Sequence, residues 1–163
     1  PKINGGFGFT IKYDQHLSLN AFFNFRCGNK VINYARMYAE NMYSNDNQSI
    51  AVNWRWRKDG DLTEIPRALY QDGRNWLGSD RFVENGSFVR FKQLTLNYTI
   101  ERKSLKYLGL SQLALSFTLN NILTFTKYTG VDPEISPNSQ GVCADYSRTP
   151  RSKYFTMGVT LGF

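Results

Sequence analysis

The sequence predicts an all-β fold, a single antiparallel sheet that forms part of a transmembrane β-barrel. Three observations predict it. Apolar and polar residues alternate in five separate runs, as in strands with two different faces. The apolar faces are rich in aromatic residues, whereas the opposite faces carry mainly Gly, Ser, Thr and Asn. The runs extend over about ten residues, enough for a tilted strand to cross a bilayer, whereas soluble strands average about five or six.

The first two runs are neighbours in the sequence, at residues 5–13 and 16–26. In both runs the apolar residues occupy odd positions, and the even positions are mostly small or polar. Only Asp14-Gln15 separates the two runs. Because the alternation continues up to this dipeptide on both sides, the runs are expected to pair as a tight hairpin.

Three more runs follow, at residues 87–100, 113–125 and 153–163. In the first of these, the apolar positions are odd up to Phe91 and even from Leu94 onwards. Such a change of phase near Lys92-Gln93 is typical of a β-bulge, which inserts one extra residue into a strand. The other two runs keep their apolar residues on odd positions.

Long and short connections alternate between these runs. Residues 27–86 and 126–152 are long connections, whereas the 14–15 and 101–112 connections are short. An antiparallel meander of this kind has short turns at one end and long loops at the other, as an outer-membrane barrel has. Residues 104–108, which precede Gly109, are expected to form one short helical turn.

The 60-residue connection 27–86 is expected to be ordered, because a structureless loop of that length is uncommon in a folded domain. Residues 31–42 show helical spacing, and residues 50–56 alternate like a short extra strand. Contacts with neighbouring loops are expected to order the connection.

Five strands are too few to close a barrel. Bacterial outer-membrane barrels have an even number of strands, at least about eight, and an open sheet in lipid leaves unpaired backbone groups at its edges. The chain is therefore interpreted as part of a larger barrel. Two alternatives stay open, namely a soluble β-sandwich that binds glycans through exposed aromatic residues, and a small stand-alone outer-membrane barrel.

The net charge of +7 does not indicate a nucleic-acid partner. The long connections are neutral, because residues 27–86 carry eight basic and eight acidic residues and residues 126–152 carry three of each. The excess positive charge lies in the strands and in connection 101–112. No continuous basic surface of the kind that tracks phosphates is expected.

The sequence predicts no enzyme activity, no cofactor and no metal site. His16 is the only histidine, and it stands beside a turn at the start of a strand. Asp132 and Glu134 are two carboxylates, whereas calcium takes about six to eight oxygen ligands. The glycine-rich residues 5–8 lack the third glycine and the following helix of a dinucleotide-binding loop.

Several segments of the chain resemble SusC/RagA-type TonB-dependent transporters. They are residues 79–98 (SDRFVENGSFVRFKQLTLNY), residues 120–134 (NNILTFTKYTGVDPE), the IPR motif at residues 65–67, and the last strand at residues 154–163 (YFTMGVTLGF). The resemblance extends from about Gly5 to Phe163.

This resemblance implies a plugged, roughly 22-stranded barrel in the outer membrane of a Gram-negative bacterium of the Bacteroidota. Such transporters import oligosaccharides or oligopeptides with a SusD-like surface lipoprotein as a lid, and TonB acts on the plug. Residues 1–163 are then the C-terminal portion of the barrel, without the plug, in contact with the remaining strands and with lipid. Because the C-terminus of such a barrel is periplasmic, residues 27–86 and 126–152 are outer loops, and Phe163 is the C-terminal residue for barrel assembly.

Three groups of residues are candidate sites. Aromatic and basic residues of the first outer loop are candidates for contact with a ligand or with the lid, since Trp and Arg dominate interface hot spots; these are Trp54, Arg55, Trp56, Arg67 and Trp76. Packing within the loop is the alternative. Residues expected to face the lumen, or to pair with the plug, are Lys12, Asn20, Arg26 and Arg90. Cys27 and Cys143 lie in outer loops, either as a disulfide or as two separate thiols.

Overall fold

The computed structural model describes residues 1–72, 78–101, 105, 107 and 109–163, and it divides into two compact units. The first, which we call the sheet unit, consists of Pro1–Asn29, Ser87–Lys127 and Pro150–Phe163. The second, the loop unit, consists of Lys30–Gly86 and Tyr128–Thr149. The described parts of the two long connections thus fold with each other, as expected for a connection ordered by neighbouring loops.

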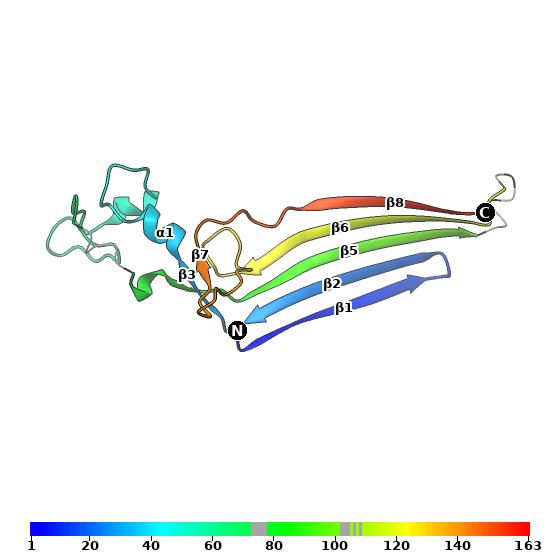
Figure 1. Ribbon diagram of the computed structural model, residues 1–163, viewed down its shortest axis with the longest axis horizontal. Helices are drawn as coiled ribbons and strands as arrows, with labels where there is room; N and C mark the ends of the chain where they lie inside the picture. Colours follow the sequence, from blue (N-terminus) through cyan, green and yellow to red (C-terminus); the bar gives the residue numbers. More distant parts are fainter. Residues whose placement is uncertain (73–77, 102–104, 106, 108) are drawn as a thin grey trace. The chain divides into compact units, whose positions relative to one another are not determined.

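The sheet unit is one antiparallel sheet with the strand order β1-β2-β5-β6-β8 (Figure 1). Each strand pairs with the next long strand along the chain, so the sheet is a simple meander. The five predicted strands are confirmed, with small shifts at their ends. They are β1 (Ile3–Tyr13), β2 (Leu17–Cys27), β5 (Phe88–Glu101), β6 (Gln112–Thr126) and β8 (Tyr154–Gly162).

The β1–β2 hairpin is tight, as predicted, but three residues form its loop instead of two. Tyr13 pairs with Leu17, and Asp14 adopts the left-handed φ of 56° that closes the turn. His16 bonds to β5 instead of β1, because its backbone oxygen accepts a 2.7 Å hydrogen bond from the N–H of Thr99. The imidazole Nδ1 also lies 3.0 Å from the Thr99 oxygen. The histidine therefore has a structural role at a strand end.

The bulge predicted in β5 is confirmed by its pairing with β2. Phe22 pairs with Gln93, but the next residue, Phe23, pairs with Phe91. Lys92 is therefore an extra residue in β5. Since side chains alternate between faces with period two, this insertion moves the apolar positions of β5 from odd numbers before it to even numbers after it.

A second insertion lies in β6, beside the bulge of β5. It cannot be recognised from the alternation of apolar and polar residues in the sequence. Gln93 pairs with Asn120, whereas Phe91 pairs with Leu123, so two steps in β5 face three steps in β6. Asn121 lies in this irregularity with a positive φ of 52°. Relative to β2, β6 carries two extra residues, and an even number of insertions leaves its apolar residues on odd positions.

The sheet unit has a single layer. β1 and β8 each pair with one neighbour, so both edges of the described sheet present unpaired backbone groups. Every residue of β1 is exposed. A β-sandwich would bury one face of each of two packed sheets, and the sheet unit contains one sheet, so the soluble sandwich alternative is wrong. The five strands do not close on themselves either, which argues against a stand-alone barrel.

The loop unit is built on a small sheet with the order β4-β3-β7. β3 is antiparallel to β4 and parallel to β7, which comes from the other long connection. Its core is a buried cluster of Val31, Tyr128, Ile135 and Cys143. The elements are β3 (Lys30–Asn33), α1 (Tyr34–Ala39), η1 (Ile50–Trp54), η3 (Asp80–Phe82), β4 (Val83–Asn85) and β7 (Ala144–Asp145).

Two sequence-based predictions in the loop unit are wrong in part. The helix predicted at residues 31–42 covers only α1, because β3 takes up Val31–Asn33 in its pairing with β4 and β7. Residues 50–56 begin with the 3₁₀ helix η1 instead of a strand, and the Ser49 side chain caps it by accepting from the N–H of Ala51. The helical turn predicted at residues 104–108 lies largely outside the described residues.

Candidate functional site: the two faces of the sheet and the loop unit

The apolar positions of the five strands lie on one face of the sheet, because the register aligns them from strand to strand. Phe7 pairs with Phe23, Phe23 with Phe91, and Phe91 with Leu123. The rings of Phe7 and Phe23 stack with centroids 5.0 Å apart, and those of Phe23 and Phe91 with centroids 4.5 Å apart. We call this surface the apolar face.

The apolar face is largely exposed in the chain, above all on the edge strands. The exposed fractions are 50% for Phe9, 54% for Ile11, 65% for Phe155, 70% for Met157 and 66% for Val159. Soluble monomers rarely expose a continuous apolar surface of this extent. The hydrocarbon core of a bilayer can surround this surface without a hydrophobic penalty, and the three inner strands have their backbone groups paired on both sides.

The opposite, polar face carries a network of short side chains. Thr10 Oγ1 donates a 2.7 Å hydrogen bond to Asn20 Oδ1, and the hydroxyls of Thr95 and Thr118 are 3.0 Å apart. Asn20 pairs with Thr10 on one side and Thr95 on the other, which continues the face across three strands. Lys12 shares this face and is exposed. Lys12 and Asn20 therefore lie on the side that the sequence predicted for the lumen.

Arg26 and Arg90 belong to the same polar face, near the strand ends that lead to the long connections. Phe88 pairs with Arg26, and the guanidinium carbons of Arg26 and Arg90 lie 6.0 Å and 5.6 Å from the centroid of its ring. Arg90 Nε also donates a 3.0 Å hydrogen bond to Thr124 Oγ1. Arg26 and Arg90, both candidates for the lumen, thus lie close together because both guanidinium groups pack on the ring of Phe88.

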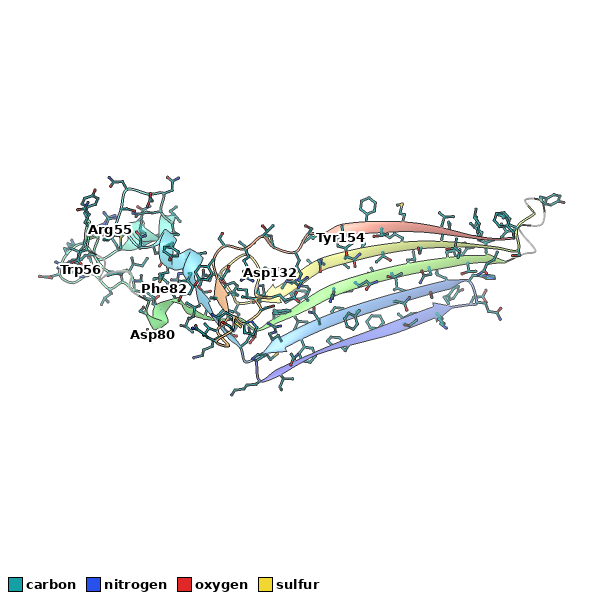
Figure 2. All side chains as sticks on the ribbon, in the orientation of Figure 1. Arg55, Trp56, Asp80, Phe82, Asp132 and Tyr154 are labelled. Carbon is teal, nitrogen blue, oxygen red and sulfur yellow. The ribbon has the colours of Figure 1, made fainter. Side chains whose placement is uncertain are left out.

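Trp54 is the last residue of η1 in the loop unit, and Arg55 and Trp56 follow it. Figure 2 labels Arg55 and Trp56. Trp54 is 65% exposed. Arg55 is the C-cap residue, and its Nη1 donates a 3.2 Å hydrogen bond to the Val52 oxygen. The N–H of Trp56 donates to the Ile65 oxygen at 2.9 Å. The segment is therefore held by backbone bonds and presents its first tryptophan outwards.

The remaining candidates from the sequence are Arg67, Trp76, the two cysteines and Phe163. Arg67 is exposed, and Trp76 lies outside the described residues. Cys27 is an exposed free thiol of the sheet unit, and Cys143 is a buried free thiol of the loop unit. Both alternatives for these cysteines, a disulfide or two separate thiols, stay predictions. Phe163 is 91% exposed.

The loop unit contains a partly buried polar network that the alternation of the sequence did not indicate, centred on Glu84 of β4. Its carboxylate accepts hydrogen bonds from the Thr129 N–H at 2.9 Å and hydroxyl at 2.7 Å, from Asn33 Nδ2 at 3.1 Å and from Arg36 Nη1 at 3.3 Å. Burial by itself would raise the pKa of Glu84, but these four bonds outweigh it and hold the pKa below its usual value of 4.5.

Two further charged residues extend this network. Arg36 Nε donates a 2.7 Å hydrogen bond to Oε1 of Glu40, whose side chain is 3% exposed. Arg81 Nη2 lies 4.0 Å from Oε2 of the same carboxylate. Burial lowers the pKa of Arg81 although Glu40 partly offsets the effect. The equal numbers of basic and acidic residues in connection 27–86 were a sequence signal consistent with such internal pairs.

A second buried pair lies in the same unit. The Tyr128 hydroxyl donates a 2.6 Å hydrogen bond to Asp145 Oδ2. Burial raises the pKa of Tyr128, and the hydrogen bond to the Asp145 carboxylate raises it further. Asp145 Oδ1 accepts from the N–H of Ser147 at 2.9 Å. These contacts connect the loops around β7.

The described residues show neither a metal site nor a membrane-spanning helix. No group of three or more His, Cys, Asp or Glu residues is placed to hold a metal ion in the described part of the chain. Within the same residues, no helix is both long enough and apolar enough to cross a bilayer.

No protein-family model matches the chain, but individual proteins do. It is similar to TonB-dependent receptor P3 of Formosa agariphila, with 30% identity over 170 residues that cover 100% of this chain and 16% of that protein. It is also similar to TonB-dependent receptor SusC of Bacteroides thetaiotaomicron, with 26% identity over 159 residues that cover 95% of this chain and 14% of that protein.

Solved structures agree with these relatives. The fold matches the RagAB peptide importer in its closed-closed state with a TM-score of 0.81 and 28% identity, over 98% of this chain and 17% of the RagAB chain. The chain is a segment of a SusC/RagA-type TonB-dependent receptor. This receptor segment spans between 14% and 17% of the length of these relatives.

The segments that carried the resemblance have clear structural positions in the receptor segment. Residues 79–98 run through η3 and β4 into β5, and residues 120–134 run from β6 into the loop unit. Glu84 belongs to the first and Thr129 to the second, so their hydrogen bonds join the two motifs. The motifs themselves were therefore the signal that could have led to this pair.

Proposed function

We propose that the chain forms five adjacent strands and two outer loops of an active transporter in the outer membrane of a Bacteroidota bacterium. The observation that carries the proposal is the open sheet, with one exposed apolar face, one polar face, and an edge strand on each side that has a single neighbour. On this proposal the remaining strands of the receptor pair with β1 and β8. The named relatives, all TonB-dependent receptors, support it.

In this transporter the sheet forms part of the barrel wall. Its apolar face contacts lipid, and its polar face lines the lumen through which the substrate passes. The substrates are oligosaccharides or oligopeptides, a SusD-like surface lipoprotein covers the outer opening, and TonB acts on a plug formed by another part of the receptor. The structural match to the RagAB peptide importer supports the transport of oligomers.

The sidedness of the sheet can be tested in the full-length receptor in its own outer membrane. Phe9 and Thr10 are consecutive in β1 and lie on opposite faces, so single cysteines at these positions, in a background with Cys27 and Cys143 replaced by serine, form a matched pair. We expect Thr10→Cys to react with a small water-soluble maleimide and Phe9→Cys to be protected. Equal reaction at both positions would contradict the proposal.

Transport itself needs a separate test in cells. Deletion of the receptor gene is expected to abolish uptake of the imported oligomer, and the wild-type gene is expected to restore it. Because TonB depends on the proton-motive force, a protonophore should stop uptake without releasing the receptor from the membrane. Uptake that persists with the protonophore would exclude active transport.

We further propose that Trp54 contacts the lid lipoprotein. Trp54 is 65% exposed, and its loop-unit neighbours Ile50 and Leu62 are 73% and 101% exposed. Large exposed side chains of this type are typical interface anchors. We expect Trp54→Ala to reduce co-purification of the lid, whereas Tyr70→Phe, at a residue that is 65% exposed, serves as the control. Normal lid binding with reduced uptake would point to substrate contact instead.

A further inference from the structure

One side chain on the polar face departs from its small and polar surroundings. Phe22 lies at an even position of β2, where its neighbours on the same face are Asn20 and Asn24, and it is 41% exposed. The ring lies across β1 because two glycines leave room for it. A Cβ added to Gly6 would stand 2.7 Å from Phe22 Cζ, and one added to Gly8 would stand 3.2 Å from Cδ2.

A groove with a volume of about 410 Å³ lies beside this ring. That volume is within the range of about 300–1,000 Å³ that is usual for ligand pockets. Four uncharged polar side chains line the groove together with Phe22, namely Thr10, Asn20, Gln93 and Thr95. Phe22 and Gln93 form the last pair before the bulge at Lys92, so the irregularity of the sheet borders the groove.

The two amide side chains of the groove keep part of their hydrogen-bonding capacity. Asn20 Oδ1 accepts the bond from Thr10, which leaves the Nδ2 group of Asn20 as a donor. Gln93 Nε2 donates to Thr95 Oγ1 at 3.2 Å, which leaves Oε1 of Gln93 as an acceptor. Among the described residues, the lining contains no charged side chain.

We propose that this groove is a binding subsite for one ring of a neutral saccharide. The face of an aromatic ring carries partial negative charge, so it attracts the polarised C–H groups on the flat side of a pyranose. Asn20 and Gln93 then bind neighbouring hydroxyls as donor and acceptor. An uncharged lining gives no counter-charge for the ends or ionised side chains of peptides. The inference rests on the proposed transport function and narrows its substrate to neutral oligosaccharides.

Calorimetric titration of the purified full-length receptor tests the proposal, with neutral glucan, mannan and xylan oligosaccharides and an uncharged oligopeptide of similar mass as probes. Phe22→Leu keeps an apolar side chain but removes the ring face. Phe22→Tyr keeps the ring. Phe155→Leu makes the same change at a phenylalanine of the apolar face that is 65% exposed and does not line the groove, and it is the matched control. Heat-modified migration in gels checks that every variant is folded.

At least one oligosaccharide is expected to bind the wild-type receptor. Phe22→Leu is expected to weaken that binding about fivefold, a factor within the range of an aromatic pair interaction. Phe22→Tyr and Phe155→Leu are expected to leave it unchanged. Gly6→Ala provides a second variant, in which residue 22 remains phenylalanine but the added methyl group displaces its ring. This variant should also weaken saccharide binding.

Three results would overturn the subsite. They are no saccharide binding by the wild-type receptor, unchanged binding by Phe22→Leu, and a loss for the oligopeptide equal to that for the saccharide. A Phe22→Leu receptor that binds normally but loses its plug to limited proteolysis would show that the ring packs on the plug. Since energy-dependent uptake and cysteine labelling are measured independently, the transport function can stand while this inference falls.

Discussion

The Thr129 hydroxyl lies 2.7 Å from the carboxylate of Glu84, and the N–H of the same threonine donates to that carboxylate at 2.9 Å. The two residues are 45 positions apart and come from different long connections. Their contact fastens the segment after β6 to the segment before β5 within the loop unit. A carboxylate that accepts several such bonds keeps its charge to lower pH.

The loop unit should therefore lose local stability in acid. The folded pKa of Glu84 lies below 4.5, so its contribution is complete above pH 4.5 and is lost as the pH falls through the lower folded value. Hydrogen exchange of the full-length receptor, corrected for intrinsic rates, should show faster exchange at residues 128–130 in that range. Glu84→Gln should already exchange faster at pH 7, and Asp59→Asn, an exposed carboxyl change, should behave as wild type.

Removing the Tyr128 hydroxyl should destabilise the same unit. In the wild-type chain the Tyr128 hydroxyl donates a hydrogen bond to the carboxylate of Asp145, a residue that is 4% exposed. Tyr128→Phe removes this donor. A buried acceptor that loses its partner costs about 1–3 kcal/mol. Faster hydrogen exchange at residues 143–147 is the expected result. Tyr70→Phe, at an exposed tyrosine, is the control, and equal protection in the two variants would contradict the structural role of the pair.

The irregularity in β6 should depend on the backbone of Asn121. Its φ of 52° is disfavoured for β-branched residues, and its Nδ2 donates a 2.8 Å hydrogen bond to the Ser152 oxygen. Asn121→Val should cost about 1–3 kcal/mol from the backbone alone. Asn121→Gly should cost less, because glycine adopts this conformation freely. The temperature at which the folded receptor converts in gels measures both, with Ile122→Val as the neighbouring control.

The two faces of β8 should respond differently to a charge. Met157 is 70% exposed on the apolar face, and Thr156 lies on the opposite face of the same strand. Arginine on the lipid face of a barrel near the bilayer midplane costs about 2–4 kcal/mol. Met157→Arg should therefore lower the amount of folded receptor in the outer membrane, and Thr156→Arg should not. Equal losses would mean that the apolar face does not contact lipid.

Local patterns were sufficient to predict the sheet. Period-two alternation is a property of neighbouring residues, so it located all five long strands and assigned Lys12, Asn20, Arg26 and Arg90 to one face before any contact was known. The bulge at Lys92 was visible because one insertion reverses the phase. The insertion at Asn121 was not visible, because β6 has two extra residues relative to β2 and two insertions leave the phase of the alternation unchanged.

The loop unit was beyond such patterns. Val31 belongs to a strand although its spacing is helical, because β3 pairs with β4 and with β7 from another connection. The prediction of a strand at residues 50–56 failed for a related reason, since capping by Ser49 and contacts elsewhere in the unit decide that segment. Contacts between remote segments leave no period in the sequence.

The sequence by itself therefore determined the class of fold, the two chemically different faces and the resemblance to SusC/RagA-type receptors. The reason is that every second side chain of a strand lies on the same face, so a face in contact with lipid requires an apolar residue at every second position. Only the tertiary structure decided which long connections fold together, how Glu84 and Tyr128 find their partners, and that Phe22 lies over Gly6 and Gly8 beside a groove. Those features depend on the register between strands and on contacts between distant loops, which arise when the chain folds.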